Sequence, residues 1–388
     1  MIFLYVIFVL SMFIIFWAMI GYPVSLIFLK KTFFKNKYTK KDYDYLPTVT
    51  VMIVAHNEEK VIKEKLENVI MNDYPSERIK YLISSDNSND LTNNIVRDFI
   101  ISHPMLNMEL YEARERKGKT NAQNEAQKLV NTEILIMTDA NSLFRENAIR
   151  ELISTFVSED IYYVCGNLVY VNEHTSMSST SESTYWNLDL EMRRIESSIQ
   201  TITAGNGSIY ACRNKEYIDL DPIQSHDGNF PRLFALQGKK AKFNPDAIAY
   251  EKAGETIEDE YKRKVRMNRG ILRNILPNIQ ILNAFKYKWY TYFYLGHRTS
   301  RYLLWLSQIL LFSLSLLIGL ENQYFLVIFV MQIIFYLIGF LDRKYQWPYK
   351  STNLISYYCI TIFAQIHGVY NILTGKVKPF WEKAESTR

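Results

Sequence analysis

The stretch ILIMTDAN, residues 134–141, joins a short apolar run to an acidic turn. An apolar run of this length is typical of a buried strand. Because Asp139 comes directly after the run, we expect it at the carboxyl edge of a sheet, where open α/β folds bind ligands. A carboxylate there, with a second oxygen ligand at Asn141, suits a hard divalent cation held against phosphates. Taken by itself, Asp139 could equally be a turn former.

Apolar runs alternate with helical spacing on the amino-terminal side of this stretch. The sequence predicts strands at 49–54, 81–83, 108–111 and 134–137, and helices at 60–71, near 91–102 and at 119–130. Strands that alternate with helices predict a parallel sheet with right-handed crossovers. We therefore expect a Rossmann-like α/β domain whose sheet is mainly parallel. Its second half is less regular, and no strands are assigned there.

Long apolar segments flank this domain. Residues 1–29 carry no charge and are long enough to cross a membrane as a helix. A cleaved signal peptide is the weaker alternative, because a basic start and a small-residue cleavage site are missing. Residues 303–320 and 324–341 predict a transmembrane hairpin. A fourth segment, 354–373, is long enough to span, and we expect it to do so although it carries polar residues.

Charge predicts the orientation of these segments. Lysines crowd the stretch after residue 29, and the positive-inside rule makes this flank cytoplasmic. The tip of the hairpin has no Lys or Arg, so we expect it outside. Lysines of the tail favour the inside, which conflicts with a spanning 354–373. Aromatic residues around Lys286 and Lys288 predict a helix in the membrane interface.

The predicted organisation is an N-terminal transmembrane helix at 1–29, a basic cytoplasmic linker at 30–46, a catalytic domain at 47–280, an interfacial helix at 281–300, a transmembrane region of about three segments at 301–375 and a tail at 376–388.

Composition excludes some classes of protein. A net charge of +5 over 388 residues gives no indication of nucleic-acid binding. The three cysteines are far apart and form no Cys-x-x-Cys pair, so neither a zinc site nor a disulfide framework is indicated.

Seven polar motifs occur in a fixed order. They are AHNEE at 55–59, SDNSND at 85–90, RKGKT at 116–120, DAN at 139–141, TAGNGSIYA at 203–211, SHDGN at 225–229 and RKVRM at 263–267. The Gly-Lys-Thr string is not a triphosphate-binding loop, because the first glycine of that loop would fall at Ala113. Each motif also has a plain structural interpretation as a helix cap, a turn or a solvated basic helix face.

The order of these motifs resembles the inverting family 2 glycosyltransferases of the GT-A fold, from about Pro47 to Met267. The membrane-bound branch, which includes bacterial polysaccharide synthases, is the most similar. The resemblance implies that Asn57 and Glu58 contact the base and ribose of a nucleotide and that Asp86 binds the uracil or ribose. It places Lys119 beside the nucleotide, and Asn124 matches an asparagine of the family.

The resemblance also assigns the chemistry. It implies that Asp139 and Asn141 hold a divalent metal, Mg²⁺ or Mn²⁺, and that Asp227 is the catalytic base. A carboxylate suits that role, because an acceptor hydroxyl must lose its proton as it attacks the anomeric carbon. Arg263 and Arg266, three apart on a helix, would face the departing diphosphate.

The sequence departs from the family pattern at Ser85, Asn141, His226 and Met267, among other positions. Met267 replaces a tryptophan that stacks on the acceptor sugar, which favours single addition over processive synthesis. The departures also support a rival hypothesis, a catalytically degenerate membrane scaffold that partners an active transferase. A nucleotidyltransferase is less favoured, because no carboxylate-rich triphosphate site is present.

The expected function is therefore an inverting, metal-dependent glycosyltransferase at the cytoplasmic face of a bacterial inner membrane. The resemblance implies a nucleotide-sugar donor, UDP-linked, and a lipid-linked saccharide or a growing polysaccharide as acceptor. Other polysaccharide-assembly proteins are expected partners. The C-terminal Trp381-Glu382-Lys383 and Arg388 resemble a tail of some membrane-bound relatives.

Overall fold

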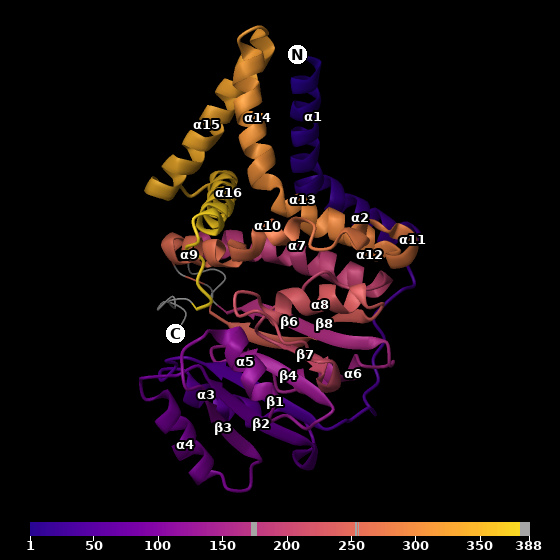
Figure 1. Cartoon of the computed structure of the whole chain (residues 1–388), viewed down its shortest axis with the longest axis vertical. Coiled ribbons are helices and arrows are strands. Elements are labelled where there is room, and N and C mark those ends of the chain that lie inside the picture. Colours follow the sequence, from indigo (N-terminus) through magenta and orange to yellow (C-terminus); the bar gives the residue numbers. More distant parts are fainter. Residues whose placement is uncertain (172–176, 253, 255, 381–388) are drawn as a thin grey trace.

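An eight-stranded mixed sheet forms the centre of the soluble half of the molecule (Figure 1). The computed structural model describes residues 1–171, 177–252, 254 and 256–380. The strand order is β3-β2-β1-β4-β7-β6-β8-β5. The apolar helices α1, α14 and α15 project from the opposite half (Figure 1).

The first four strands form the predicted parallel half of the sheet. They are β1 (Val49–Ala55), β2 (Ile79–Ser85), β3 (Met108–Glu112) and β4 (Ile134–Asp139), linked by α3 (Ile62–Ile70), α4 (Thr92–Ser102) and α5 (Lys119–Gln127). The parallel pairings of β1 with both β2 and β4 bring Ala55 opposite Ser85 and Val54 opposite Asp139. The polar residues that follow these strands therefore meet at one edge, as the sequence predicts.

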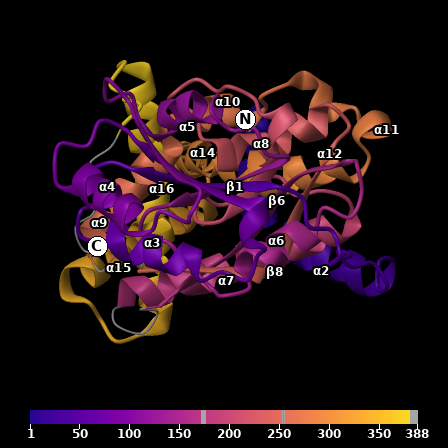
Figure 2. The ribbon, with the colours of Figure 1, turned by 90° about the horizontal axis from the view of Figure 1, so that it is seen from below.

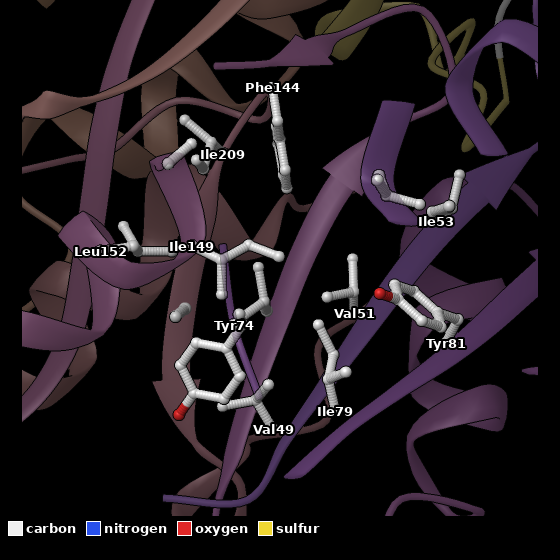
Figure 3. Close-up of a cluster of buried hydrophobic side chains, with 14 of the residues drawn as sticks. Val49, Val51, Ile53, Tyr74, Ile79, Tyr81, Phe144, Ile149, Leu152 and Ile209 are labelled. Atoms are coloured by element: carbon white, nitrogen blue, oxygen red, sulfur yellow. The ribbon is translucent and has the colours of Figure 1, made fainter. Parts of the chain in front are cut away.

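Apolar cores cover both faces of the sheet, which is why β1 is buried along its whole length. Val49, Val51 and Ile53 pack on one face with Tyr74 and Ile149 (Figure 3). Met52 and Leu82 pack on the other face with side chains of α5 and α8. Viewed from below, α3 and α6 lie on one side of the sheet and α5 and α8 on the other (Figure 2).

The second half of the sheet is mixed, which the sequence does not resolve. It comprises β5 (Leu143–Phe144), β6 (Ile161–Tyr170), β7 (Tyr210–Arg213) and β8 (Lys240–Glu251). Strand β7 is antiparallel to β4 and β6, and β5 is antiparallel to β8. Helices α6 (Ala148–Ser154), α7 (Met177–Ile199), α8 (His226–Leu236) and α9 (Ile257–Met267) accompany these strands. The sheet is parallel only where helical crossovers return the chain to the same edge.

Two helices of the described residues are long and apolar enough to cross a membrane, or three if one bent pair is a single span. The first runs from Ile2 to Thr32 and comprises α1 (Ile2–Phe16), a π-helical turn (Trp17–Gly21) and α2 (Tyr22–Thr32). The second is α15 (Gln323–Tyr345). The bent pair joins Trp289–Tyr302 to α14 (Leu304–Gly319) at 55°. Helices α14 and α15 occupy the predicted hairpin segments, and α14 passes the test only as part of the bent pair.

Helix α16 (Lys350–Leu373) differs from the expected fourth span. It does not pass the same test of length and apolarity, and Figure 1 shows it almost end-on while α14 and α15 run lengthwise. Its polar side chains have partners on the domain side: Gln365 Nε2 donates to the Arg301 carbonyl (2.9 Å), and His367 Nδ1 lies 3.0 Å from Tyr261 Oη. These contacts place α16 across the top of the domain.

The expected interfacial helix is broken into short pieces. Around it lie α10 (Ile271–Ile275), α11 (Ala284–Tyr287), α12 (Trp289–Phe293), a π-helical segment (Tyr294–Thr299) and α13 (Ser300–Tyr302). Short 3-10 turns occur at Ser76–Arg78, Asn214–Glu216, Asn268–Gly270 and Ile279–Leu282. Lys288 has φ +55°, which ends α11. This layer lies between the sheet and the apolar helices (Figure 1).

Candidate active site

A cavity of about 510 Å³ opens at the carboxyl edge of β1, β2 and β4. It is lined by ends of these strands, by the start of α5 and by α9. Predicted site residues in its wall are Glu58, Asp86, Lys119, Asp139, Asn141, Arg263 and Arg266. We call it the donor cavity, after the expectation from the sequence that its residues bind a sugar donor. Residues from five motifs that are far apart in the chain therefore share one wall.

Asn57 is not among the residues that line either large cavity. It has φ +55°, and its side chain exchanges hydrogen bonds with Asn89 at 2.6 and 2.8 Å. These bonds tie the loop after β1 to the loop after β2. Asn57 therefore shapes the edge of the donor cavity, and its expected contact with the nucleotide stays a prediction.

Asp86 uses both carboxylate oxygens to hold the loop that follows β3. Its Oδ1 accepts from the Lys117 amide at 3.0 Å and its Oδ2 from the Gly118 amide at 2.9 Å. Gly118 has φ +96°, a conformation that side chains disfavour, so glycine suits this position. Asp86 thus fixes the start of α5, and with it Lys119, while its side chain lines the cavity.

Lys119 and Asp139 form an ion pair inside the cavity. The side chains are 18% and 32% exposed, so a ligand can reach both. Asn141 Nδ2 donates to Glu251 Oε1 at 2.9 Å, and Ser208 Oγ donates to Glu251 Oε2 at 2.9 Å. Oxygen atoms of Asp139, Asn141 and Glu251 therefore gather on one wall.

The donor atoms on this wall fit a magnesium or manganese ion. Asp139 offers an accessible carboxylate, and Mg²⁺ is commonly bound through one or two carboxylates together with substrate phosphates. Within the described residues no group of three or more His, Cys, Asp or Glu side chains is placed to share a metal. Tight binding would therefore depend on a diphosphate that completes the coordination.

Asp227 lines a second, larger cavity of about 550 Å³. The two cavities share Lys119, Asp139, Glu251, Gly254, Arg263 and Arg266, so they meet at the ion pair. Asp227 lies in the first turn of α8, where the helix dipole stabilises a negative charge. We call the second cavity the acceptor cavity, after the expected role of Asp227 as the base for an acceptor hydroxyl.

Two glycines of the 203–211 motif bring the acidic residues close together. The Gly205 amide donates to the Asp227 carbonyl at 2.8 Å. A Cβ on Gly207 would lie 3.1 Å from Lys119 Nζ, 3.2 Å from Asp139 Oδ2 and 3.9 Å from Asp227 Oδ2. Gly207 thus lies between the expected metal ligand and the expected base, and a side chain there would crowd both.

Asn124 and His226 lie behind the cavity wall. Asn124 is buried, its Nδ2 donates to the Leu220 carbonyl (2.8 Å), and its Oδ1 accepts from Tyr217 Oη (3.0 Å). His226 Nδ1 lies 2.9 Å from Gln123 Oε1. Asn124 is not among the residues that line either cavity, and its expected place beside the donor stays a prediction. Both residues position the start of α8 and therefore Asp227.

His226 should make the protein sensitive to acid. Burial, reinforced by the Lys119 cation, lowers the pKa of His226 from 6.5 to about 3. The unfolded chain therefore binds this proton from about pH 6.5 downward, before the folded protein does. Stability should fall by about 1.4 kcal/mol for each pH unit below this value. We expect the thermal midpoint of detergent-solubilised wild type to drop more between pH 7 and 5 than that of His226→Gln.

A matched control is His103→Gln at the surface end of α4, which should keep the wild-type dependence on pH. If the thermal midpoint of His226→Gln fell with pH as steeply as that of wild type, a neutral, buried His226 would be contradicted.

Arg263 and Arg266 both line the two cavities from α9, as their spacing predicts. The Glu260 carboxylate accepts hydrogen bonds from Arg263 Nε (2.7 Å) and Arg263 Nη2 (3.0 Å). Burial, with the neighbouring Arg263 and Arg269, lowers the pKa of Arg266 to about 10, so it stays charged at neutral pH. Met267 is 61% exposed and lines the acceptor cavity.

The chain beyond α16 returns to the donor cavity. Lys378 and Phe380 belong to its lining, and the Arg116 guanidinium lies 4.8 Å from the centre of the Phe380 ring. Arg269 Nη1 donates to the Pro379 carbonyl at 3.0 Å. Trp381, Glu382, Lys383 and Arg388, which belong to the tail motif, lie outside the described residues.

Two site residues have no counterpart in the sequence-based prediction. Glu251, at the end of β8, pairs with Asn141 across the sheet edge. Lys65 is fully buried and donates to Thr138 Oγ1 at 3.0 Å, directly before Asp139. Burial lowers the pKa of Lys65 to about 7. Its signal in the sequence is a lysine within the apolar stripe of α3, whereas Glu251 offers no local signal.

Comparisons with known proteins agree with this geometry. The family model described as Glycosyl transferase family 2 matches residues 50–219. The mannosyltransferase PcManGT of Pyrobaculum calidifontis, solved with GDP-Man and Mn²⁺, superposes with a TM-score of 0.73 at 18% identity, covering 95% of this chain and 99% of that one. This likeness shows the fold.

Curated relatives include two poly-beta-1,6-N-acetyl-D-glucosamine synthases. The one from Staphylococcus epidermidis is 24% identical over 261 residues, which cover 65% of this chain and 62% of the relative. The one from Staphylococcus aureus is 22% identical over 240 residues, covering 61% and 57%. The matched region thus spans less than two thirds of the length of these relatives.

The sheet topology and the likeness to PcManGT show a GT-A fold. Within this fold, residues 50–219 resemble glycosyl transferase family 2.

Proposed function

We propose that this protein moves a sugar from a nucleotide-sugar donor, UDP-linked, to a lipid-linked saccharide or a growing polysaccharide, with inversion at the anomeric carbon. The observation that carries the proposal is the arrangement around Gly207, which separates the Lys119–Asp139 pair from Asp227 by the width of one side chain. Donor-binding groups and a base therefore face one junction between two cavities.

The donor cavity supports binding of a nucleoside diphosphate. Lys119, Arg263 and Arg266 supply positive charge to its wall. The guanidinium groups stabilise the charge that develops on the departing diphosphate. A divalent metal held by Asp139 and Asn141 would act as a Lewis acid on the diphosphate oxygens. Asp86 and Glu58 line the other end of the cavity, toward the ends of β1 and β2, where the nucleoside would lie.

Asp227 acts as the base in this proposal. Its carboxylate takes the proton of the acceptor hydroxyl, whose oxygen attacks the anomeric carbon from the acceptor cavity. The bond from that carbon to the diphosphate oxygen breaks, and its electron pair leaves with the diphosphate. A single displacement of this kind inverts the anomeric centre and passes through an oxocarbenium-like transition state.

Charge supports a cytoplasmic position for the catalytic domain. The lysine-rich segment that follows α2 packs along the domain, since Lys41 Nζ donates to Glu151 and Asp246, each at 2.6 Å. Arg343 and Lys344 end α15 on the domain side (Figure 1). A domain on the cytoplasmic face satisfies the positive-inside rule for both segments. With α16 lying across the domain, the basic tail stays on that side as well.

The rival hypothesis of a degenerate scaffold is less well supported. Asp86, Lys119, Asp139 and the α9 arginines Arg263 and Arg266 share one cavity, although they come from four separate parts of the chain. Two of the residues that depart from the family pattern have polar partners at the site. Asn141 donates a hydrogen bond to Glu251, and His226 lies within hydrogen-bond distance of Gln123. The length of the product would separate processive synthesis from single addition.

The proposal is tested by nucleotide release from a panel of UDP- and GDP-sugars. Detergent-purified protein is supplied with bacterial lipid extract as acceptor, with and without Mn²⁺ or Mg²⁺. We expect release with one donor that depends on the metal. Folded protein that releases no nucleotide from any donor would instead support the scaffold hypothesis.

A further inference from the structure

The acceptor cavity extends from Asp227 to the helices beneath the membrane-side half of the protein. Its wall includes Asp189 and Arg193 of α7, Tyr302 of α13 and Tyr357 and Gln365 of α16. These helices lie between the sheet and the hairpin of α14 and α15 (Figure 1). A ligand in this cavity can therefore reach from Asp227 to the helices that lie beneath the apolar hairpin.

The cavity wall is rich in arginine. Two of its arginines, Arg263 and Arg266, also belong to the donor cavity. The six others line the acceptor cavity alone: Arg193, Arg232, Arg269, Arg273, Arg298 and Arg301. In that part of the wall the acids are Asp189 and Asp227. A wall lined by one sign of charge concentrates ligands of the opposite sign. A neutral saccharide alone does not account for this excess of positive charge.

A buried network neutralises some of these cations and holds them in place. Asp189 accepts from Arg193 Nη2 (2.5 Å) and from Arg301 Nη1 (2.7 Å). Burial raises the pKa of Asp189, but Arg193, His297 and Arg301 together lower it well below its usual value, so this carboxylate stays ionised. Glu196 lies 2.6 Å from His297 Nδ1 on the opposite side of the imidazole ring.

Two arginines outside this network keep an unused N–H. Arg298 Nε donates to Thr203 Oγ1 at 3.0 Å, and Arg232 Nη2 donates to Asn229 Oδ1 at 2.6 Å. The buried Arg298 Nη2 and Arg232 Nε have no hydrogen-bond acceptor within the described residues. A buried donor without a partner costs stability, and a ligand oxygen would remove that cost. Arg232 as a whole is only 7% exposed.

We propose that the acceptor cavity binds the phosphate or diphosphate of an acceptor whose sugar is joined through that group to a lipid chain. The inference rests on the proposed function and specifies its acceptor. Arg232 lies in the same helix as Asp227, and Arg298 contacts the 203–211 motif, so the anionic group would lie beside the base. The lipid chain would leave the cavity past α13 and α16 into the membrane.

The test compares acceptors that carry the same sugar on an isoprenoid diphosphate, on a neutral alkyl chain, or as a free oligosaccharide. We expect the diphosphate-linked lipid to be used at least tenfold more efficiently. Arg298→Gln and Arg232→Gln should each raise its KM about tenfold, the loss of one charge-assisted hydrogen bond. The KM of the donor should not change, and Arg298→Lys should restore part of the affinity.

Arg194→Gln is the matched control, because Arg194 is 51% exposed and pairs with Glu191 on the outer face of α7. It should behave as wild type. If the neutral lipid were used as efficiently as the diphosphate-linked lipid, and KM were unchanged in Arg298→Gln and Arg232→Gln, the inference would be overturned. Nucleotide release by the same protein would then still support the proposed function.

A binding measurement distinguishes failure of the proposed phosphate subsite from failure of the proposed sugar transfer. Short-chain isoprenyl diphosphate and inorganic diphosphate are titrated calorimetrically into the protein without donor. Binding of the lipid diphosphate that weakens about tenfold in Arg298→Gln supports the subsite even if no sugar is transferred. Binding of inorganic diphosphate alone, or no binding of either, would overturn it.

Discussion

Replacing Asp227 by Asn should lower kcat for sugar transfer by about three orders of magnitude, because the amide cannot take the proton of the acceptor hydroxyl. The substitution keeps the size of the side chain, and the Asp227 carbonyl would still accept from the Gly205 amide. The KM for the donor should therefore remain within about twofold of wild type. Steady-state nucleotide release and product formation in detergent measure both quantities.

The control for this variant is Asp98→Asn on the exposed face of α4, which should leave kcat unchanged. A donor titration and a thermal midpoint should confirm that Asp227→Asn is folded. If folded Asp227→Asn kept more than a tenth of wild-type turnover, another group would have to be the base.

Replacing Asp139 by Asn should lower turnover by about two to three orders of magnitude and shift the requirement for Mn²⁺ to higher concentration. Asp139 is the accessible carboxylate of the oxygen-lined wall, and an amide is a weaker ligand for a hard cation. The variant also leaves Lys119 without its ion-pair partner, so donor binding at saturating metal should weaken less than metal binding does. Nucleotide release as a function of Mn²⁺ concentration measures the shift.

Asp227→Asn provides the comparison for this experiment, because it should keep the wild-type affinity for metal and donor. The expected contrast is a metal defect in one variant and a turnover defect in the other. An unchanged dependence on Mn²⁺ in Asp139→Asn would exclude Asp139 as a metal ligand.

The parallel half of the fold is predictable from local sequence. Each of its strands is a short apolar run, and each helix has apolar residues at helical spacing, so the period of hydrophobicity identifies both. Parallel pairing then brings Asp86 and Asp139 to one edge without further information. The mixed half is not predictable in this way, because β7 pairs with β4 across about seventy residues of intervening chain and no local pattern specifies that partner.

The candidate site likewise has a part that is predictable from the sequence and a part that is not. Asp139, Asp227, Lys119 and the α9 arginines are recognisable because each lies in a short motif, and the structure brings them to adjoining cavities. Asn57 and Asn124 also lie in motifs, yet the structure uses their amides to hold loops together. A motif identifies a residue, but only its neighbours in space decide whether it faces the ligand or supports a residue that does.

The sequence by itself determined the apolar helices and the parallel strands, since each depends on residues close together in the chain. Asp227 as the base follows from a motif that resembles a family, and that role stays a prediction. Only the tertiary structure decided the position of α16, the pairing of Asn141 with Glu251 and the convergence of Arg193, Arg232 and Arg298 on one cavity. Those arrangements join segments separated by tens to hundreds of residues. Long-range packing and burial select such contacts, and they leave no periodic trace in the sequence.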